Sequence, residues 1–495
     1  MKNVISNLQR FIGSRQFFYG ILGFFIFEVI WMIFSALYPM AFDEDFHLGI
    51  IRVYADHWLP FLKEQPAGAD AFGAVARDPS YLYHYLMSFP YRLIVAVTDN
   101  QTYQVIFLRL INLGLAAYSL VLFRKIVQRA TKSPALTNVS MFIFVLVPIV
   151  PQLAAHINYD NLVMVLMGWV CILVYRIIDE FKAKKINVRT LLLLVNLLLL
   201  TSLVKYAFLP IAVATGLFVV YYAFRTLGDV PIWSDIKRSI LSWQKPVLIG
   251  LTLLSLVSGG LFAQRFGINA LTYGDPIADC GKVLTYDNCK EYGPWIRNHN
   301  LSLNKGVVDE NPLAYSFTWI KGLWYRSFFA VNGSTSNFTN YPPLPLPYVA
   351  AVVIIGIGIL LFIRYAWRIL RNDPFAVFSM MVVGMYCGAL WYEEYGQFVE
   401  TGQPVAINGR YLIPIMFLIA ILLGRAYQCA FDRSRQTCVI LATVAMLCFL
   451  HGGGLATFIL RSDASWDWAN PTVVRINDGA RKVLAPVIFE GSKFY

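Results

Sequence analysis

The apolar run FFYGILGFFIFEVIWMIFSAL occupies residues 17–37 and decides the class of this protein. Its length matches the roughly 20 residues that an α-helix needs to cross the hydrocarbon core of a bilayer. No small-residue cleavage site follows, so we expect a membrane anchor and not a signal peptide. We interpret Glu28, the one acid inside this run, and Arg109, inside a later apolar run, as structural.

The composition of the whole chain agrees with a membrane protein. Of its 495 residues, 58% are hydrophobic and 14% are charged, and the mean hydropathy is +0.57. Soluble domains carry roughly 25% charged residues, so a soluble fold is excluded. Further apolar runs lie near residues 103–123, 138–154, 160–178, 190–208, 207–224, 246–264, 346–366, 375–392, 410–427 and 437–459. The sequence therefore predicts an all-α integral membrane protein, a single polytopic domain (1–495) of about 11 membrane helices.

The net charge of +12 is unevenly distributed around these helices. With the N-terminus in the cytoplasm, Lys and Arg strongly outnumber Asp and Glu in the inner loops, whereas the outer segments are slightly acidic. This is the positive-inside pattern, and it predicts a cytoplasmic N-terminus and an outer C-terminus. The basic charge is thereby explained by the membrane topology, so membrane lipids are expected partners and no nucleic-acid partner is expected.

Four polar segments are placed outside by this topology: 39–102, 265–345, 393–409 and the tail 460–495. In the first segment, the stretches 48–62 and 81–97 are aromatic-rich and too short to span, so we expect helices lying in the membrane interface. The second segment is long enough to fold over a site as a capping loop.

Two of the seven cysteines, Cys280 and Cys289, fall in an outer loop. An oxidising outer compartment would permit a disulfide between them. The other five cysteines lie in or near membrane helices, where we expect them to be packing residues.

Three acids and a histidine follow the first apolar run directly, in FDEDFH at residues 42–47. Adjacent carboxylates repel one another at the low dielectric of the bilayer edge, which favours a functional cluster over a solvated loop. We expect Asp43 and Glu44 to be catalytic, and Asp45 and His47 to contact substrate. If a metal is bound, Asp43, Glu44 and His47 are its candidate ligands, and a divalent cation (Mg²⁺ or Mn²⁺) shared with a substrate phosphate stays open.

Further polar residues on the outer side occur where helices begin or end: Tyr159, Asp160, Lys205, Arg326, Arg410 and Tyr411. Asp160 opens a helix and can cap it, or contact substrate. Lys205 interrupts an apolar run, so it either extends to the interface or holds an anion. Arg410 follows a glycine at a helix start, where a guanidinium and free N–H groups bind phosphate. Their concentration on one side predicts an active site at the outer membrane surface.

Acids beside anion-binding cations suit the transfer of a sugar from a lipid-linked sugar phosphate. The phosphate leaves without a general acid, unlike the leaving group in glycoside hydrolysis, which uses two carboxylates. One carboxylate then accepts the proton of the acceptor hydroxyl, while cations stabilise the departing phosphate. A single in-line displacement inverts the anomeric centre.

The sequence motifs support the same interpretation. They are Pro39 followed by Asp43-Glu44 and His47, then Asn158-Tyr159-Asp160, Ser327-Phe328-Phe329 with Asn332-Gly333, and Asn408-Gly409-Arg410-Tyr411-Leu412-Ile413-Pro414. The first resembles the acidic motif of the GT-C superfamily of integral-membrane glycosyltransferases, and the others resemble a bacterial family of polytopic proteins grouped with GT-C. The resemblance implies a GT-C-like bundle in the bacterial inner membrane with a periplasmic active site. It also implies a polyprenyl-phosphate-linked sugar donor, a glycan or lipid-linked acceptor, and Asp43 as the base, although the adjacent Asp45 leaves the choice among the three acids open.

Two other functions compete with this one. An O-antigen polymerase or ligase would act on similar lipid-linked glycans, but such sites rest on Arg and His in outer loops without a leading Asp-Glu motif. A transporter of lipid-linked glycans would show repeat symmetry, broken helices and ionisable residues near the bilayer midplane. No repeat is visible here, and the polar residues crowd one face.

Overall fold

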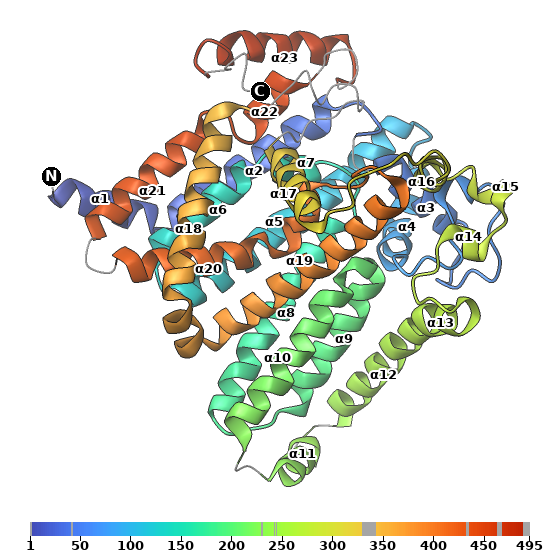
Figure 1. The fold of residues 1–495 in the computed structure, drawn as a ribbon, viewed down its shortest axis with the longest axis horizontal. Helices are drawn as coiled ribbons and strands as arrows, with labels where there is room; N and C mark the ends of the chain where they lie inside the picture. Colours follow the sequence, from blue (N-terminus) through green and yellow to red (C-terminus); the bar gives the residue numbers. More distant parts are fainter. Residues whose placement is uncertain are drawn as a thin grey trace.

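The computed structural model describes residues 2–40, 43–228, 231–241, 243, 245–328, 343–431, 435–462 and 468–488. Every named element in these ranges is a helix (Figure 1). The α-helices are α1 (Lys2–Ile12), α2 (Arg15–Ser35), α3 (Glu44–Ala55), α4 (Leu82–Val95), α5 (Gln101–Thr131), α6 (Pro134–Leu146), α7 (Ile149–Ala154), α8 (Asp160–Lys182), α9 (Val188–Val204), α10 (Leu209–Leu227), α11 (Ile232–Leu241), α12 (Lys245–Phe262), α13 (Ile268–Tyr273), α14 (Cys280–Val283), α15 (Tyr286–Cys289), α16 (Gly293–Leu303), α17 (Pro312–Phe328), α18 (Pro345–Asn372), α19 (Pro374–Thr401), α20 (Ile413–Phe431), α21 (Arg435–Leu450), α22 (Leu455–Arg461) and α23 (Pro471–Leu484). Single turns, η1 (Asp70–Phe72), η2 (Tyr206–Phe208) and η5 (Gly409–Leu412), and a π-helical turn η3 (Ala263–Gly267) complete them.

Within the described ranges, nine helices are long and apolar enough to cross a membrane, which confirms a multi-pass membrane protein. The expected number was about eleven. The apolar runs near 138–154 and 190–208 form shorter helices instead. The first of these runs is divided into α6 and α7 because Pro148 lacks an N–H and forces Val147 into an extended conformation (φ −68°, ψ 116°).

Alternating membrane crossings require the helix ends to lie at two opposite ends of the bundle. At one end, which we call the basic end, Arg129 in the last turn of α5 forms an ion pair with Asp179 of α8. At the same end Gln428 of α20 donates a hydrogen bond to the main-chain oxygen of Thr131 at 2.7 Å. The C-terminal ends of α5, α8 and α20, which lead into loops expected inside, therefore lie together.

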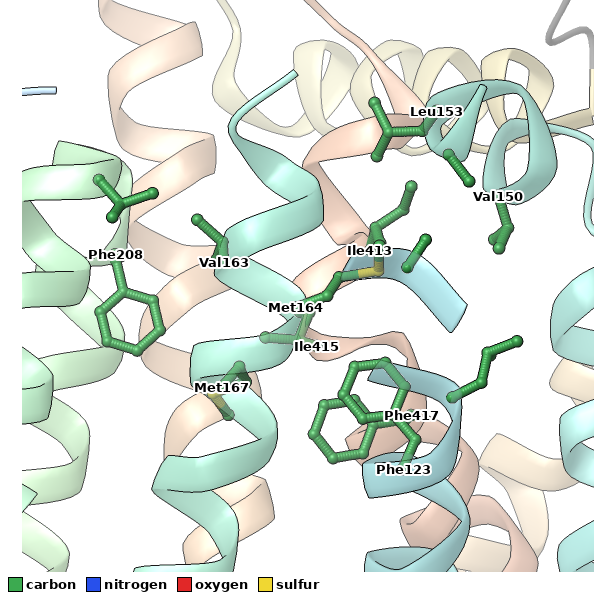
Figure 2. Close-up of a cluster of buried hydrophobic side chains, with 14 of the residues drawn as sticks. Phe123, Val150, Leu153, Val163, Met164, Met167, Phe208, Ile413, Ile415 and Phe417 are labelled. Atoms are coloured by element: carbon green, nitrogen blue, oxygen red, sulfur yellow. The ribbon is translucent and has the colours of Figure 1, made fainter. Parts of the chain in front are cut away.

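Close packing of apolar side chains joins the central helices (Figure 2). Phe123 of α5 and Phe417 of α20 stack with ring centroids 4.0 Å apart, and Met164 and Met167 of α8 are buried beside them. Lipid tails are as apolar as these side chains, so such helices associate through close packing and not through burial from water.

The first outer segment, 39–102, contains α3 and α4, which overlap the stretches 48–62 and 81–97 that are expected to be helical. Leu48, Ile51 and Tyr54 of α3 are fully buried, so this helix packs inside the protein. The close approach of α3 to η1 depends on Gly49, because a Cβ at this position would lie 2.0 Å from the ring of Phe72. This packing holds the acidic segment at the start of α3 in a fixed place.

The long outer segment 265–345 contributes α13 to α17, and it contains a disulfide between Cys280 and Cys289, the pair singled out by the sequence. Residues 329–342, with Phe329 and the Asn332-Gly333 motif, lie outside the described residues, as does Phe42. The ring of Tyr292, just before α16, lies 6.0 Å from the ring of Phe46 in α3. Part of this segment therefore sits beside the acidic motif.

The helix α2 is joined to the C-terminal segments of the chain. Glu28 accepts a hydrogen bond from the main-chain N–H of Leu455, at the start of α22, at 2.8 Å. Trp31 donates to the side-chain oxygen of Asn477 in α23 at 2.9 Å. Glu28 therefore has the structural role expected of it, and its partner is α22.

Candidate functional site

A buried arginine joins the end of α2 to the start of α3. Arg109 of α5 donates from Nε to Oε1 of Glu44 at 2.9 Å and from Nη2 to Oε2 at 2.7 Å. It also donates to the main-chain oxygens of Ile33, Ala36 and Leu37 at 3.0–3.2 Å. The last carbonyl groups of a helix have no partner inside the helix, and here the guanidinium supplies one.

Glu44 is held by more than this arginine. Its Oε2 accepts a hydrogen bond from the N–H of Met40 at 2.8 Å, and its Oε1 accepts one from Ile157, between α7 and α8, at 3.1 Å. Burial raises the pKa of Glu44, but the charge and hydrogen bonds of Arg109 outweigh burial and leave the pKa below its usual 4.5. Because both of its oxygens accept hydrogen bonds, Glu44 holds the neighbouring segments in place.

Asp43 occupies the N-cap position of α3 in an unusual way. Its backbone is left-handed (φ 66°, ψ 31°), and its side chain makes no capping bond to the first turn of the helix. Instead Oδ2 accepts a hydrogen bond from Nη2 of Arg410 at 2.6 Å. The left-handed conformation is uncommon outside glycine, and Asp tolerates it better than most residues. The side chain of Asp43 remains 54% exposed, so its carboxylate is accessible.

Arg410 is brought to Asp43 by a close contact between η5 and α17. A Cβ at Gly409 would lie 2.6 Å from the main-chain nitrogen of Ser327, so only glycine fits there. Asn408 accepts a hydrogen bond from the N–H of Arg410 at 3.0 Å and starts the turn. Gly409 of the Gly-Arg-Tyr motif therefore allows the close packing that places Arg410 beside Asp43.

A second buried ion pair lies nearby, between Lys205 and Asp160. Nζ of Lys205 is 2.6 Å from Oδ1 of Asp160, and both side chains are almost completely buried. The ammonium also lies 4.8 Å from the ring centroid of Tyr159 and 5.2 Å from that of Tyr411. Burial and the charge of Arg410 lower the pKa of Lys205, and together they outweigh the opposite effect of Asp160. The Lys205–Asp160 pair is therefore close enough to the Arg410–Asp43 pair to interact with it electrostatically.

Three buried histidines border these ion pairs. His47 follows Asp43 by one turn of α3, and its Nδ1 lies 2.9 Å from Nε2 of His84 in α4. Burial lowers the pKa of His84 to about 3 and that of His156 to about 4, and it holds the pKa of His47 well below its usual value. All three imidazoles are therefore neutral at pH 7.

The remaining predicted residues lie at the margin of this cluster. Asp45 is exposed on α3. Arg326 of α17 donates to the main-chain oxygen of Ile407, in the segment that leads to η5. Arg326 thus supports the segment that carries Arg410.

The candidate metal ligands do not form a cage. In the part of the chain that the structure describes, no group of three or more His, Cys, Asp or Glu side chains is arranged to hold a metal ion. Glu44 is bound to Arg109, and Asp43 is bound to Arg410. Of these two carboxylates, that of Asp43 remains exposed.

Sequence reasoning missed one residue of the site and the partner of another. His84 lies in an aromatic-rich stretch, where a histidine has no visible partner in the sequence. Arg109 was interpreted as structural without a partner, because the depth of a residue in one helix does not reveal its neighbour in another.

No protein-family model matches this chain, and no curated protein matches it either. The geometry of the site is therefore the main support for a function.

Proposed function

We propose that this protein is an inverting glycosyltransferase of the GT-C type. It moves a sugar from a polyprenyl-phosphate donor to a hydroxyl of a glycan or lipid-linked acceptor at the outer face of the membrane. The observation that carries the proposal is the ion pair between Asp43 and Arg410, residues 367 positions apart in the sequence. It brings the candidate base together with the candidate phosphate-binding cation.

In this proposal Arg410 and Lys205 bind the phosphate of the donor. Each cation is paired with one carboxylate, so a donor phosphate competes with Asp43 for Arg410 and with Asp160 for Lys205. A guanidinium binds phosphate through two parallel hydrogen bonds and is well suited to this exchange. Donor binding then releases the carboxylate of Asp43 for its own role.

The chemical step is a single displacement. The acceptor oxygen forms a bond to the anomeric carbon while the bond from that carbon to the phosphate oxygen breaks. The electron pair of the broken bond leaves with the phosphate, where Arg410 and Lys205 stabilise it. Asp43 accepts the proton of the acceptor hydroxyl and later returns it to solvent.

The proposed location is the bacterial inner membrane, with the site in the periplasm. The charge asymmetry of the loops supports this orientation. The Cys280–Cys289 disulfide supports it too, because α15 of that segment packs against η1 of the first outer segment. Disulfides persist in an oxidising compartment such as the periplasm.

The test compares envelope glycans by mass spectrometry in cells that lack the protein and carry either the wild type or one variant. Asp43→Asn is expected to give the same missing sugar as the deletion. Asp45→Asn is the matched control, because it removes the same charge from an exposed neighbour, and it is expected to restore the glycan. A full glycan with Asp43→Asn would remove Asp43 as the base. Identical glycans with and without the protein would remove the proposed function.

A further inference from the structure

The hydrogen bonds of His84 determine which ring nitrogens carry protons. Nδ1 of His84 lies 3.0 Å from the main-chain oxygen of Ser80, and a carbonyl oxygen only accepts, so this Nδ1 is the donor. A neutral imidazole has one N–H, which makes Nε2 of His84 an acceptor. The Nδ1 of His47 at 2.9 Å must therefore donate to it. The two rings form a chain of fixed polarity that begins at a main-chain carbonyl.

This polarity leaves a lone pair at Nε2 of His47. The residue is 1% exposed, and Nε2 has no hydrogen-bond partner among the residues that the structure describes. A buried acceptor without a partner is costly, and such groups in native proteins usually meet a ligand or an ordered water. Here the hydrogen bond between His84 and His47 leaves the unpartnered acceptor at Nε2 of His47.

The surroundings of His47 place this lone pair beside the proposed donor site. His47 and Asp43 lie one turn apart on α3, where the N–H of His47 donates to the main-chain oxygen of Asp43 at 3.0 Å. The ring of Tyr159 lies 4.6 Å from the ring of His47, and Lys205 lies over the same tyrosine. His47 is thus one aromatic ring away from Lys205, and it lies on the same helical turn as Asp43, the partner of Arg410.

The lone pair at Nε2 of His47 can bind only a group that carries a hydrogen-bond donor. A phosphate oxygen also presents lone pairs, so it is bound by Arg410 and Lys205 and not by His47. A hydroxyl carries a hydrogen that His47 can accept. We propose that Nε2 of His47 accepts a hydrogen bond from a hydroxyl of the bound carbohydrate, and that His84 acts as a positioning residue by fixing the polarity of His47. This inference rests on the proposed function and names the group of the substrate that the site recognises.

Two substitutions of His47 separate the roles of its two nitrogens. His47→Asn keeps an N–H donor near the position of Nδ1 and loses the acceptor at Nε2. His47→Gln places an amide oxygen near Nε2 and loses the Nδ1 donor. A purely structural role through His84 predicts that Asn is the better replacement, whereas a carbohydrate contact predicts that Gln is.

The experiment measures binding of undecaprenyl phosphate, and of a panel of undecaprenyl-phosphate sugars, to the full-length protein in detergent. For the sugar that the wild type prefers over the bare phosphate, His47→Asn is expected to weaken binding about tenfold to a hundredfold. His47→Gln is expected to recover most of this loss, and neither variant should change binding of the bare phosphate. His84→Asn should weaken sugar binding less and likewise spare the bare phosphate.

The outcomes distinguish this inference from the proposed function. If donor binding is unchanged but the KM for the acceptor rises in His47→Asn, the hydroxyl belongs to the acceptor and the inference stands. Equal loss of bare phosphate and sugar phosphate, or better function with Asn than with Gln, overturns the inference and leaves the glycosyltransferase intact. A wild type that binds no undecaprenyl phosphate overturns both. A requirement for a divalent cation that disappears in His47→Asn identifies a metal ligand and overturns the inference.

Discussion

The buried ion pair between Glu44 and Arg109 makes a sharp prediction about stability. Removing one partner of a buried pair leaves an uncompensated charge and costs about 3–5 kcal/mol. Glu44→Gln removes the counter-ion of Arg109, and Arg109→Met strands the carboxylate and the carbonyl groups at the end of α2. Each single variant should therefore lose about 3–5 kcal/mol, and the double variant should lose little more than either one.

The assay is reversible unfolding in mixed micelles, with SDS as the denaturant and tryptophan fluorescence as the signal. Arg129→Met at the basic end is the matched control, because its ion pair with Asp179 is about half exposed and should contribute less than about 1 kcal/mol. Additive losses in the double variant of Glu44 and Arg109, or single losses as small as that of the control, would refute the reasoning.

Acid should act on the same pair. The pKa of Glu44 is lower in the folded than in the unfolded chain, so its contribution to stability is present above about pH 4.5. This contribution is lost as the pH falls through the folded pKa, and the double variant should lack this loss.

Three further predictions concern other parts of the site. The pKa values of His84 and His156 fall from 6.5 to about 3 and about 4 on folding. As the pH falls, these histidines therefore bind protons in the unfolded chain before they do so in the folded chain. The free energy of unfolding should then decrease below pH 6.5, by up to about 1.4 kcal/mol per pH unit for each histidine. Thermal unfolding between pH 7 and 5 measures this slope, and an unchanged slope in His156→Gln would contradict the assignment. Gly409→Ala should cost about 1–3 kcal/mol and weaken binding of undecaprenyl phosphate, because its Cβ would enter the backbone of α17, whereas Gly396→Ala has open space and should do neither. Lys205→Met should weaken binding of undecaprenyl phosphate about tenfold or more, and unchanged affinity would exclude the lysine as a phosphate ligand.

The membrane helices were predictable because length and hydropathy are local properties of the sequence. The basic end was predictable for a similar reason, since loop charge is read without knowing any contact. The division of the run near 138–154 was signalled by Pro148, but a single apolar stretch of the right length outweighed that signal. Helix lengths at such breaks depend on neighbours that satisfy the freed backbone groups.

The sequence indicated several members of the cluster but not how they are paired. Asp43, Lys205 and Arg410 stood out because charge at the edge of a membrane is costly and therefore rare. Their partners could not be predicted, because pairing depends on the relative depth and rotation of different helices. His84 shows the limit most clearly, since nothing in its own segment indicates the imidazole that it meets on α3.

The contacts of α2 have a consequence for how the chain is made. Leu455 and Asn477, which bond to Glu28 and Trp31, are synthesised 427 and 446 residues after their partners. During translation α2 therefore enters the bilayer before Leu455 has been made. At that stage the Glu28 carboxylate has no hydrogen bond from the main-chain N–H of Leu455. Until α22 has been inserted, the acid Glu28 must therefore lie among lipids or beside the insertion machinery without this partner. Nascent chains halted before residue 455 should therefore be recognised and degraded as incomplete.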